Sequence, residues 1–132
     1  MTITVTISDG ALAVGEARPC DGAGAWVCFE GIVRGDEAGR PISALLYETY
    51  EPMAQRILTS LGEELASRHG LLAVHVEHSR GRVAVGGCSF RLSLASAHRK
   101  EALAAMDEFI DRMKRDAPIW KRPEWAVTPM SA

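Results

Sequence analysis

The chain has 132 residues, of which 47% are hydrophobic and 24% charged, so residues 1–132 are expected to form one soluble globular domain. Its formal net charge of −2 at pH 7 argues against a nucleic-acid-binding protein, which needs a strongly cationic face. No apolar run reaches the roughly 20 residues of a membrane span, and the first residues lack a basic signal-peptide region, so we expect a cytoplasmic protein.

Three strands are predicted before the first helix. Residues 2–7 alternate threonine with apolar side chains, and residues 25–33 are a mostly apolar run typical of a buried strand. A segment rich in Gly, Pro and Ala connects them. Residues 35–39 form a turn, and residues 42–50 are the third predicted strand.

The first helix is predicted to begin near Pro52 and to end at Gly70. Residues 72–78 alternate again and predict a strand. Residues 82–84 and 88–95 are predicted to form a hairpin around Gly86 and Gly87.

A second helix is predicted to end at Ala117, because Pro118 disfavours helical geometry in the residue before it. Ser96 is its expected N-cap, with Glu101 in the first turn. One apolar face is predicted from residues that recur at three- and four-residue steps: Leu103, Met106, Phe109, Ile110 and Met113. Because helices and strands do not alternate regularly, the chain is expected to be an α+β protein, with a mixed or antiparallel sheet and two main helices packed on it.

Basic residues of the second helix lie close to its apolar face. Lys114 falls beside Leu103 and Ile110, and Arg99 lies in the same arc at the opposite end of the helix. Lys121 follows the apolar turn at residues 118–120. These groups could bind an anion, or their stems could lie along the core while their charged ends reach water, and geometry alone favours the second interpretation. Arg34, at a strand end, presents the same choice.

No metal site and no disulfide framework are predicted. The three cysteines have no C-x-x-C spacing, and Cys28 and Cys88 are expected to be small core residues. His75 and His78 are three apart on a strand and therefore point to opposite faces.

Four segments, taken together, resemble the large, catalytic subunit of molybdopterin synthase. They occur in order, from about Gly24 to Lys121: G-A-W-V-C-F-E-G-I-V-R, L-Y-E-T-Y-E-P-M-A, S-A-H-R and K-R-D-A-P-I-W-K. The resemblance implies a hammerhead-like arrangement of helices and strands. It also implies an enzyme that transfers sulfur to cyclic pyranopterin monophosphate to make the molybdopterin dithiolene.

In that family the sulfur donor is a small ubiquitin-like subunit that ends in a Gly-Gly thiocarboxylate. The resemblance therefore implies this partner, a homodimer of large subunits within a heterotetramer, and no cofactor or metal. An alternative is a non-catalytic relative that docks the ubiquitin-like sulfur carrier without doing chemistry. A general anion or nucleic-acid binder is a weaker idea.

Five residues match basic pocket positions of the family. Arg34, His98 and Arg99 are expected to bind substrate, and Lys114 and Lys121 to be catalytic. Arginine suits phosphate oxygens, and Lys121 could stabilise developing negative charge. Lys114 could be a general acid, a base or a nucleophilic amine, and its pKa is expected to be lowered by clustered cations and partial burial and raised by a bound anion. All five are expected to converge in one cleft.

The sequence departs from the family at two positions. The family usually has Arg directly after His78 and an acidic residue after Gly86, whereas this chain has Ser79 and Gly87. Both departures bear on the details of the substrate pocket and the subunit interface.

Overall fold

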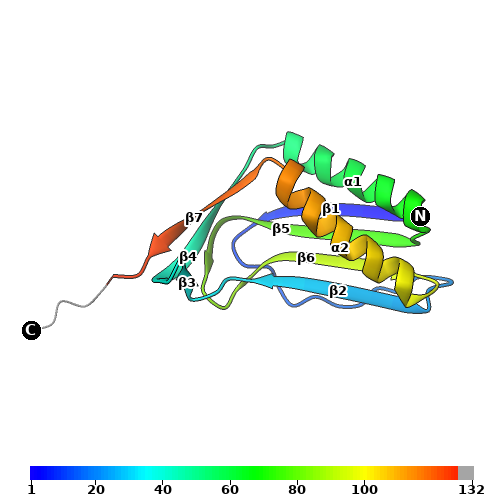
Figure 1. Ribbon diagram of the computed structural model, residues 1–132, viewed down its shortest axis with the longest axis horizontal. Coiled ribbons are helices and arrows are strands. Elements are labelled where there is room, and N and C mark those ends of the chain that lie inside the picture. The colour runs from blue at the N-terminus through cyan, green and yellow to red at the C-terminus, as the bar shows by residue number, and fades with distance from the viewer. Residues whose placement is uncertain (128–132) are drawn as a thin grey trace, which may run out of the picture.

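A seven-stranded sheet with two helices on one of its faces makes up the computed structural model, which describes residues 1–127. Helices α1 (Met53–His69) and α2 (Arg99–Asp116) lie side by side across this sheet (Figure 1). The strands are β1 (Thr2–Asp9), β2 (Ala25–Ile32), β3 (Asp36–Glu37), β4 (Arg40–Thr49), β5 (Ala73–Ala84), β6 (Cys88–Ser96) and β7 (Ile119–Trp125). The predicted α+β class is confirmed.

The sheet is mixed, and β5 is its long central strand. In order the strands run β2-β6-β5-β4-β3, with β1 parallel beside β5 and β7 antiparallel beside β4. Residues 73–78 of β5 pair with β6, whereas residues 81–84 pair with β4. Gly81 lies at this change of partner with a φ of +80°, a conformation that glycine adopts without strain. Strands β3, β4 and β7 therefore project beyond the helices at one end of the molecule (Figure 1).

Two expectations about strands are wrong. Residues 72–78 and 82–84 were predicted as separate strands but belong to the single strand β5, because β4 pairs with its second half. Strand β7 was not predicted at all. Its composition is basic and it contains Pro123, which a strand tolerates at the edge of a sheet, where its missing N–H breaks no ladder.

The main core lies between the sheet and the two helices. The apolar side chains that fill it from the sheet are Val74, Val76, Phe90, Leu92 and Leu94. Those that the helices contribute are Leu58, Leu61, Leu65, Ala66, Ala102, Ala105, Met106, Phe109 and Met113. Burial of this apolar surface is the main force that holds α1 and α2 on the sheet. Within the described residues, neither helix combines the length and apolar character needed to cross a membrane.

The ends of both helices follow from local chemistry. Gly70 ends α1 with a φ of 70°, as predicted, and Ala117 is extended before Pro118, so α2 stops there. Ser96 is not the N-cap of α2. That position belongs to His98, whose backbone N–H donates to the Glu101 carboxylate at 3.2 Å, while the Ser96 hydroxyl donates to the His98 carbonyl.

Three residues that were expected in the core are not fully buried. Leu103 is 52% exposed, because Ala102 and Ala105 occupy the face of α2 that touches the core. Cys28 is exposed and Cys88 is half-buried. The side chains of Cys28 and Glu30 lie on the helix-free face, because their neighbours Val27 and Phe29 pair with core residues of β6 and alternate residues of a strand point to opposite faces.

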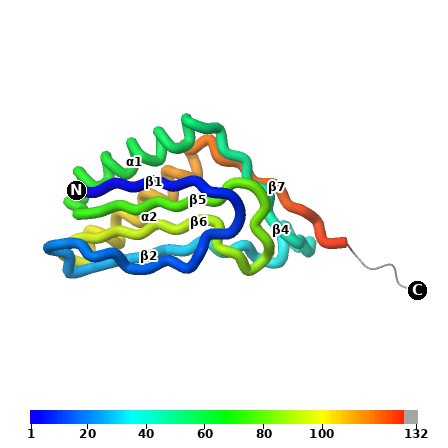
Figure 2. The backbone as a smooth tube through the Cα atoms, turned by 180° about the vertical axis from the view of Figure 1, so that it is seen from behind, coloured from blue at the N-terminus to red at the C-terminus, as the bar shows by residue number. Residues whose placement is uncertain are grey.

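The helix-free face of the sheet is partly covered by the segment between β1 and β2, which runs along it in Figure 2. Arg91, buried on β6, donates to the Ala13 carbonyl at 2.6 Å. Arg18 donates to Nδ1 of His75 at 3.0 Å. These two hydrogen bonds help to attach the segment to the sheet, together with the Leu12 N–H, which donates to the Cys88 carbonyl at 2.8 Å.

Candidate functional site

A cavity of about 600 Å³ lies where the C-terminal end of α2 meets β2, β4 and β7. Its size is in the range that small-molecule sites occupy. Part of the wall is apolar and is formed by the side chains of Phe29, Ile32, Leu45, Phe90, Ile110, Met113, Ile119 and Trp120. Three cations also line it: Arg34, Lys114 and Lys121.

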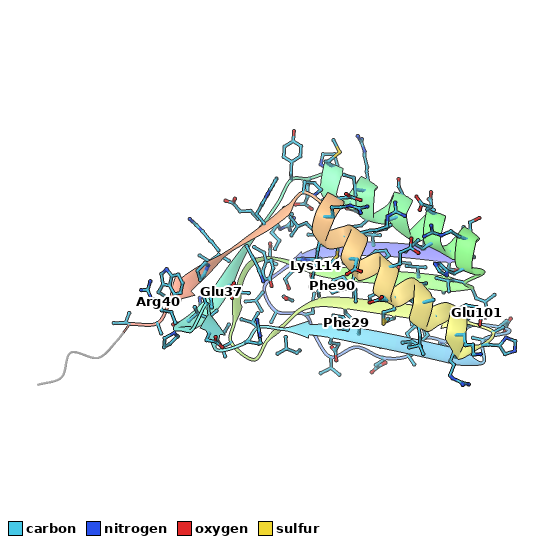
Figure 3. The ribbon with its side chains drawn as sticks, in the orientation of Figure 1. Phe29, Glu37, Arg40, Phe90, Glu101 and Lys114 are labelled. Atoms are coloured by element: carbon cyan, nitrogen blue, oxygen red, sulfur yellow. The ribbon has the colours of Figure 1, made fainter. Side chains whose placement is uncertain are left out.

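Lys114 reaches the cavity from the last turn of α2. Ile110, one helical turn before Lys114, and Met113, the preceding residue, line the same cavity. The position predicted for Lys114, on the margin of the apolar face, is therefore confirmed. The partial burial expected for this lysine is wrong, because its side chain is exposed. Figure 3 shows Lys114 at the end of α2 nearest β7.

Lys121 reaches the cavity from β7, the strand that the sequence did not predict. It is directly opposite Tyr47 in the antiparallel pair of β4 and β7. Directly opposite residues project to the same face, and both side chains line the cavity. Strand β7 thereby places a second lysine opposite the end of α2.

Arg34 follows β2 and is held by the backbone before it. Val33 is buried, its N–H donates to the Gly87 carbonyl at 3.0 Å, and its carbonyl accepts from the Gly86 N–H at 2.9 Å. The guanidinium itself is exposed. The cavity therefore has an arginine whose backbone is fixed and whose charged end is free to meet a ligand.

Glu30 and Glu37 also border the cavity, but the Glu30 carboxylate lies on the helix-free face of the sheet, where Arg91 binds it. Glu30 accepts hydrogen bonds from Arg91, at 2.8 and 3.0 Å, which lower the pKa of the Glu30 carboxyl. Among the described residues that line the cavity, three cations therefore face the one carboxylate of Glu37. The local charge favours an anionic ligand.

His98 and Arg99 do not join the other three cations within one chain. They lie at the N-terminal end of α2. Arg99 comes fifteen residues before Lys114, which corresponds to about 22 Å along the helix axis. Figure 3 shows Glu101, in the first turn, at the end of α2 far from Lys114. The expectation that all five residues converge in one cleft is wrong for a single copy of the chain. The straight helix separates them.

The deepest part of the cavity holds three polar residues that sequence analysis did not select. Tyr47, His78 and Ser89 come from the neighbouring strands β4, β5 and β6, and the Tyr47 and Ser89 hydroxyls lie 2.9 Å apart. Burial raises the pKa of Tyr47 and lowers the pKa of His78. The sequence carried no local signal for this cluster, because strand pairing alone assembles it. The predicted opposite orientation of His75 and His78 is confirmed, since His75 packs on Trp26 instead.

Neither departure from the family pattern lies in the cavity wall. Ser79 is buried, and its hydroxyl donates to the Gly10 carbonyl at 2.6 Å. A Cβ added at Gly87 would meet Cγ1 of Val83 at 2.9 Å and the Ala84 carbonyl at 3.0 Å, so this chain has no room for an acidic side chain there without rearrangement.

The chemistry available at the cavity is that of bound anions, hydroxyls and amines. Within residues 1–127, no three His, Cys, Asp or Glu side chains group as a metal ion would require. Neither Cys20, Cys28 nor Cys88 lines the cavity. The fold and the site together define a class of protein: an α+β domain with a cavity lined by cations and apolar side chains.

Comparison with known proteins names the family. The model of the MoaE protein family matches residues 6–116, and the chain belongs to this family. It is 41% identical over 100 residues to a molybdopterin synthase catalytic subunit from Thermoplasma volcanium, covering 76% of this chain and 73% of the relative. It is 37% identical over 107 residues to the Coccidioides immitis protein of the same name. That match covers 81% of this chain and 55% of the Coccidioides protein. The match to the Nostoc molybdopterin synthase catalytic subunit covers 62% of the Nostoc protein.

Solved structures agree with the fold. Molybdopterin synthase from Staphylococcus aureus superposes with a TM-score of 0.76 at 32% identity, over 82% of this chain and 79% of the other. A complex of subunits 1 and 2 of molybdopterin-converting factor from Helicobacter pylori gives 0.72 at 26% identity, over 95% and 91%. The resemblance found in the sequence is thus confirmed.

Proposed function

We propose that this chain is the catalytic subunit of a molybdopterin synthase. It transfers sulfur from the C-terminal thiocarboxylate of a small ubiquitin-like subunit to cyclic pyranopterin monophosphate, in molybdenum cofactor biosynthesis. The observation that carries the proposal is the cavity of a MoaE family member in which Arg34, Lys114 and Lys121 meet. Both reactants are anions, and these three cations offset the repulsion between them.

The roles of the three cations follow from their chemistry. Arg34 binds the substrate phosphate, because a guanidinium matches phosphate oxygens with paired N–H donors. Lys114 is the central catalytic group, where the exposed amine can move a proton or meet the acyl carbon of the donor. Lys121 stabilises negative charge that develops as sulfur attacks the pterin side chain.

The small subunit is proposed to dock where its tail can enter the cavity. Ile32 and Trp120, which are 51% and 58% exposed, offer apolar contact area at the cavity mouth. The Helicobacter structure is a complex of two subunits, which supports a two-subunit enzyme. The proposed site of action is the cytoplasm.

His98 and Arg99 are proposed to act in a second copy of the chain. They are about 22 Å from Lys114 on the same helix, so they can contact substrate only where a homodimer brings the N-terminal end of α2 to its partner's cavity. This would complete the five-residue site within a heterotetramer. Mixed dimers test it: Arg99→Ala and Lys114→Ala chains, each inactive alone, should regain about a quarter to half of the activity when combined. Absence of recovery in verified mixed dimers would refute this assignment.

Reconstitution tests the function itself. The protein is mixed with a thiocarboxylated small subunit and cyclic pyranopterin monophosphate, and dithiolene product is assayed beside a pair of known activity. Product from both mixtures is expected. Association with the small subunit without product, while the known pair works, would instead support the non-catalytic carrier-docking protein.

A further inference from the structure

The cavity changes character from its mouth to its floor. The cations Arg34, Lys114 and Lys121 are exposed at the mouth, whereas His78 and Ser89 on the floor are each 5% exposed. The floor is therefore polar but uncharged. A ligand with one anionic group and one neutral polar group would fit this gradient along its length.

His78 is held in one orientation by its neighbours. Its ring lies edge-on to Tyr47, with centroids 5.3 Å apart, and tilted against Phe90 at 5.8 Å. The Tyr47 hydroxyl is in turn hydrogen-bonded to Ser89. Two aromatic contacts on a buried ring leave little rotational freedom, so the direction of its nitrogens is set before a ligand arrives.

The hydrogen bond of Nδ1 defines the tautomer of this ring. Nδ1 lies 2.7 Å from the Ser79 carbonyl oxygen, which can only accept, so Nδ1 carries the proton. Burial lowers the pKa of His78, which favours the neutral ring. Nε2 then carries a lone pair and is a hydrogen-bond acceptor.

Nε2 is free and opens into the cavity. Among the described residues, the hydrogen bond of the His78 ring is made by Nδ1, and none is made by Nε2. Within residues 1–127, every fully buried side-chain nitrogen or oxygen has a hydrogen-bond partner. Because Nε2 has no such partner, it is not fully buried and must lie at accessible surface. The cavity that His78 lines supplies that surface. A buried neutral acceptor between the rings of Tyr47 and Phe90 discriminates strongly for a ligand that donates to it.

We propose that Nε2 of His78 accepts a hydrogen bond from the aminopyrimidine edge of the pterin, while the cations at the mouth hold its phosphate. His78 is thus a specificity-determining residue of the substrate site. This inference rests on the proposed function, because it assigns an orientation to the proposed substrate. The apolar side chains of Phe29 and Phe90 provide surface for the ring between the two polar ends.

Two amide substitutions separate recognition from a structural role. In His78→Asn the amide nitrogen can replace Nδ1 and keep the bond to the Ser79 carbonyl, but nothing replaces Nε2. In His78→Gln the amide can replace Nε2, but the bond to Ser79 is lost. We expect His78→Asn to raise the KM for cyclic pyranopterin monophosphate about tenfold to a hundredfold with little change in kcat. His78→Gln should stay within a few-fold of the wild-type KM.

A purely structural role of His78 predicts the reverse order of the two variants. Wild-type KM in His78→Asn, or an equal rise in both variants, would overturn the inference. His75→Asn is the matched control, because His75 is equally buried on the same strand but faces away from the cavity. Its KM should not change. Binding of inorganic phosphate should be the same in all four proteins, since the cations at the mouth are untouched.

A second test uses the wild-type protein, so its outcome does not depend on whether a variant folds. Pterin is compared with its N3-methyl, N2,N2-dimethyl derivative, whose aminopyrimidine edge bears no N–H, by calorimetric binding. Pterin should bind at least tenfold more tightly. Equal affinities, or no binding of either, would overturn the inference. A clear preference without dithiolene formation would refute the proposed function alone, and turnover without preference would refute the inference alone.

Discussion

Tyr47 and Lys121 are opposite residues of the β4–β7 ladder, and both side chains line the same cavity. This pairing joins a charged residue of the cavity mouth to the uncharged floor. It also explains why the C-terminal strand belongs to the site: its register with β4 determines which face Lys121 occupies. A shift of one residue would turn the Lys121 side chain to the opposite face of the sheet from Tyr47.

Lys114→Ala is expected to lower kcat of the reconstituted enzyme by a factor of about 10² to 10⁴, because it removes the proposed proton-transfer or amine group. Folding and partner binding should be nearly unchanged, since the side chain is exposed. Arg115→Ala is the control. Arg115 is the next residue on α2, pairs with Asp116 and does not line the cavity, so its loss should leave turnover intact. Full activity of Lys114→Ala would remove it from the mechanism.

The same comparison applies on β7. Lys121→Ala should reduce kcat/KM about 10²-fold or more, because one donor that stabilises developing charge is lost. Arg122 is adjacent, also exposed, and absent from the cavity wall. Steady-state kinetics of Arg122→Ala should therefore match the wild type. Equal losses in both variants would indicate a general effect of charge.

Arg91→Leu is expected to destabilise the protein by about 2–4 kcal/mol. The Arg91 side chain is 4% exposed and hydrogen-bonds to Glu30, Glu77 and the Ala13 carbonyl, all of which would lose their partner. Urea unfolding measures the effect. Arg80→Ala, which removes an exposed arginine paired with Asp9 and Glu51, should cost only about 0–1 kcal/mol. Equal costs would contradict the importance assigned to burial.

The free energy of unfolding should decrease as the pH falls below about 6.5. Burial lowers the pKa of His75, with the charge of Arg18 adding to it and that of Glu77 opposing, and burial lowers the pKa of His78 despite the hydrogen bond to Ser79. The unfolded chain then binds more protons than the folded chain in this range, so stability is lost on acidification. Urea unfolding at pH 7.5 and 5.5 measures it.

The control for that pH dependence removes both buried imidazoles. A His75→Asn, His78→Asn double variant should show a smaller difference between the two pH values than the wild type. His98→Asn, which removes an exposed imidazole, should keep the wild-type difference. An unchanged slope in the double variant would assign the pH dependence to other groups.

Local patterns in the sequence were enough for the extent of the helices and for the position of one proposed catalytic residue, Lys114. The 3.6-residue periodicity, Gly70 and Pro118 defined where α1 and α2 end. The same periodicity placed Lys114 on the margin of the buried face. These features depend on residues a few positions apart, so neighbouring chemistry decides them.

Only the tertiary structure decided which residues meet. Strand β7 has no alternating pattern of its own and forms because β4 pairs with it, and this pairing brings Lys121 to Tyr47. His78 reaches the cavity because β5 lies between β4 and β6, whereas Arg99 is kept from it by the length of α2. The order of residues along the chain by itself determined the two helices, most of the strands and the family. Contacts between distant segments determined the site, because strand register and helix length, which no short window of sequence contains, fix the direction and reach of each side chain.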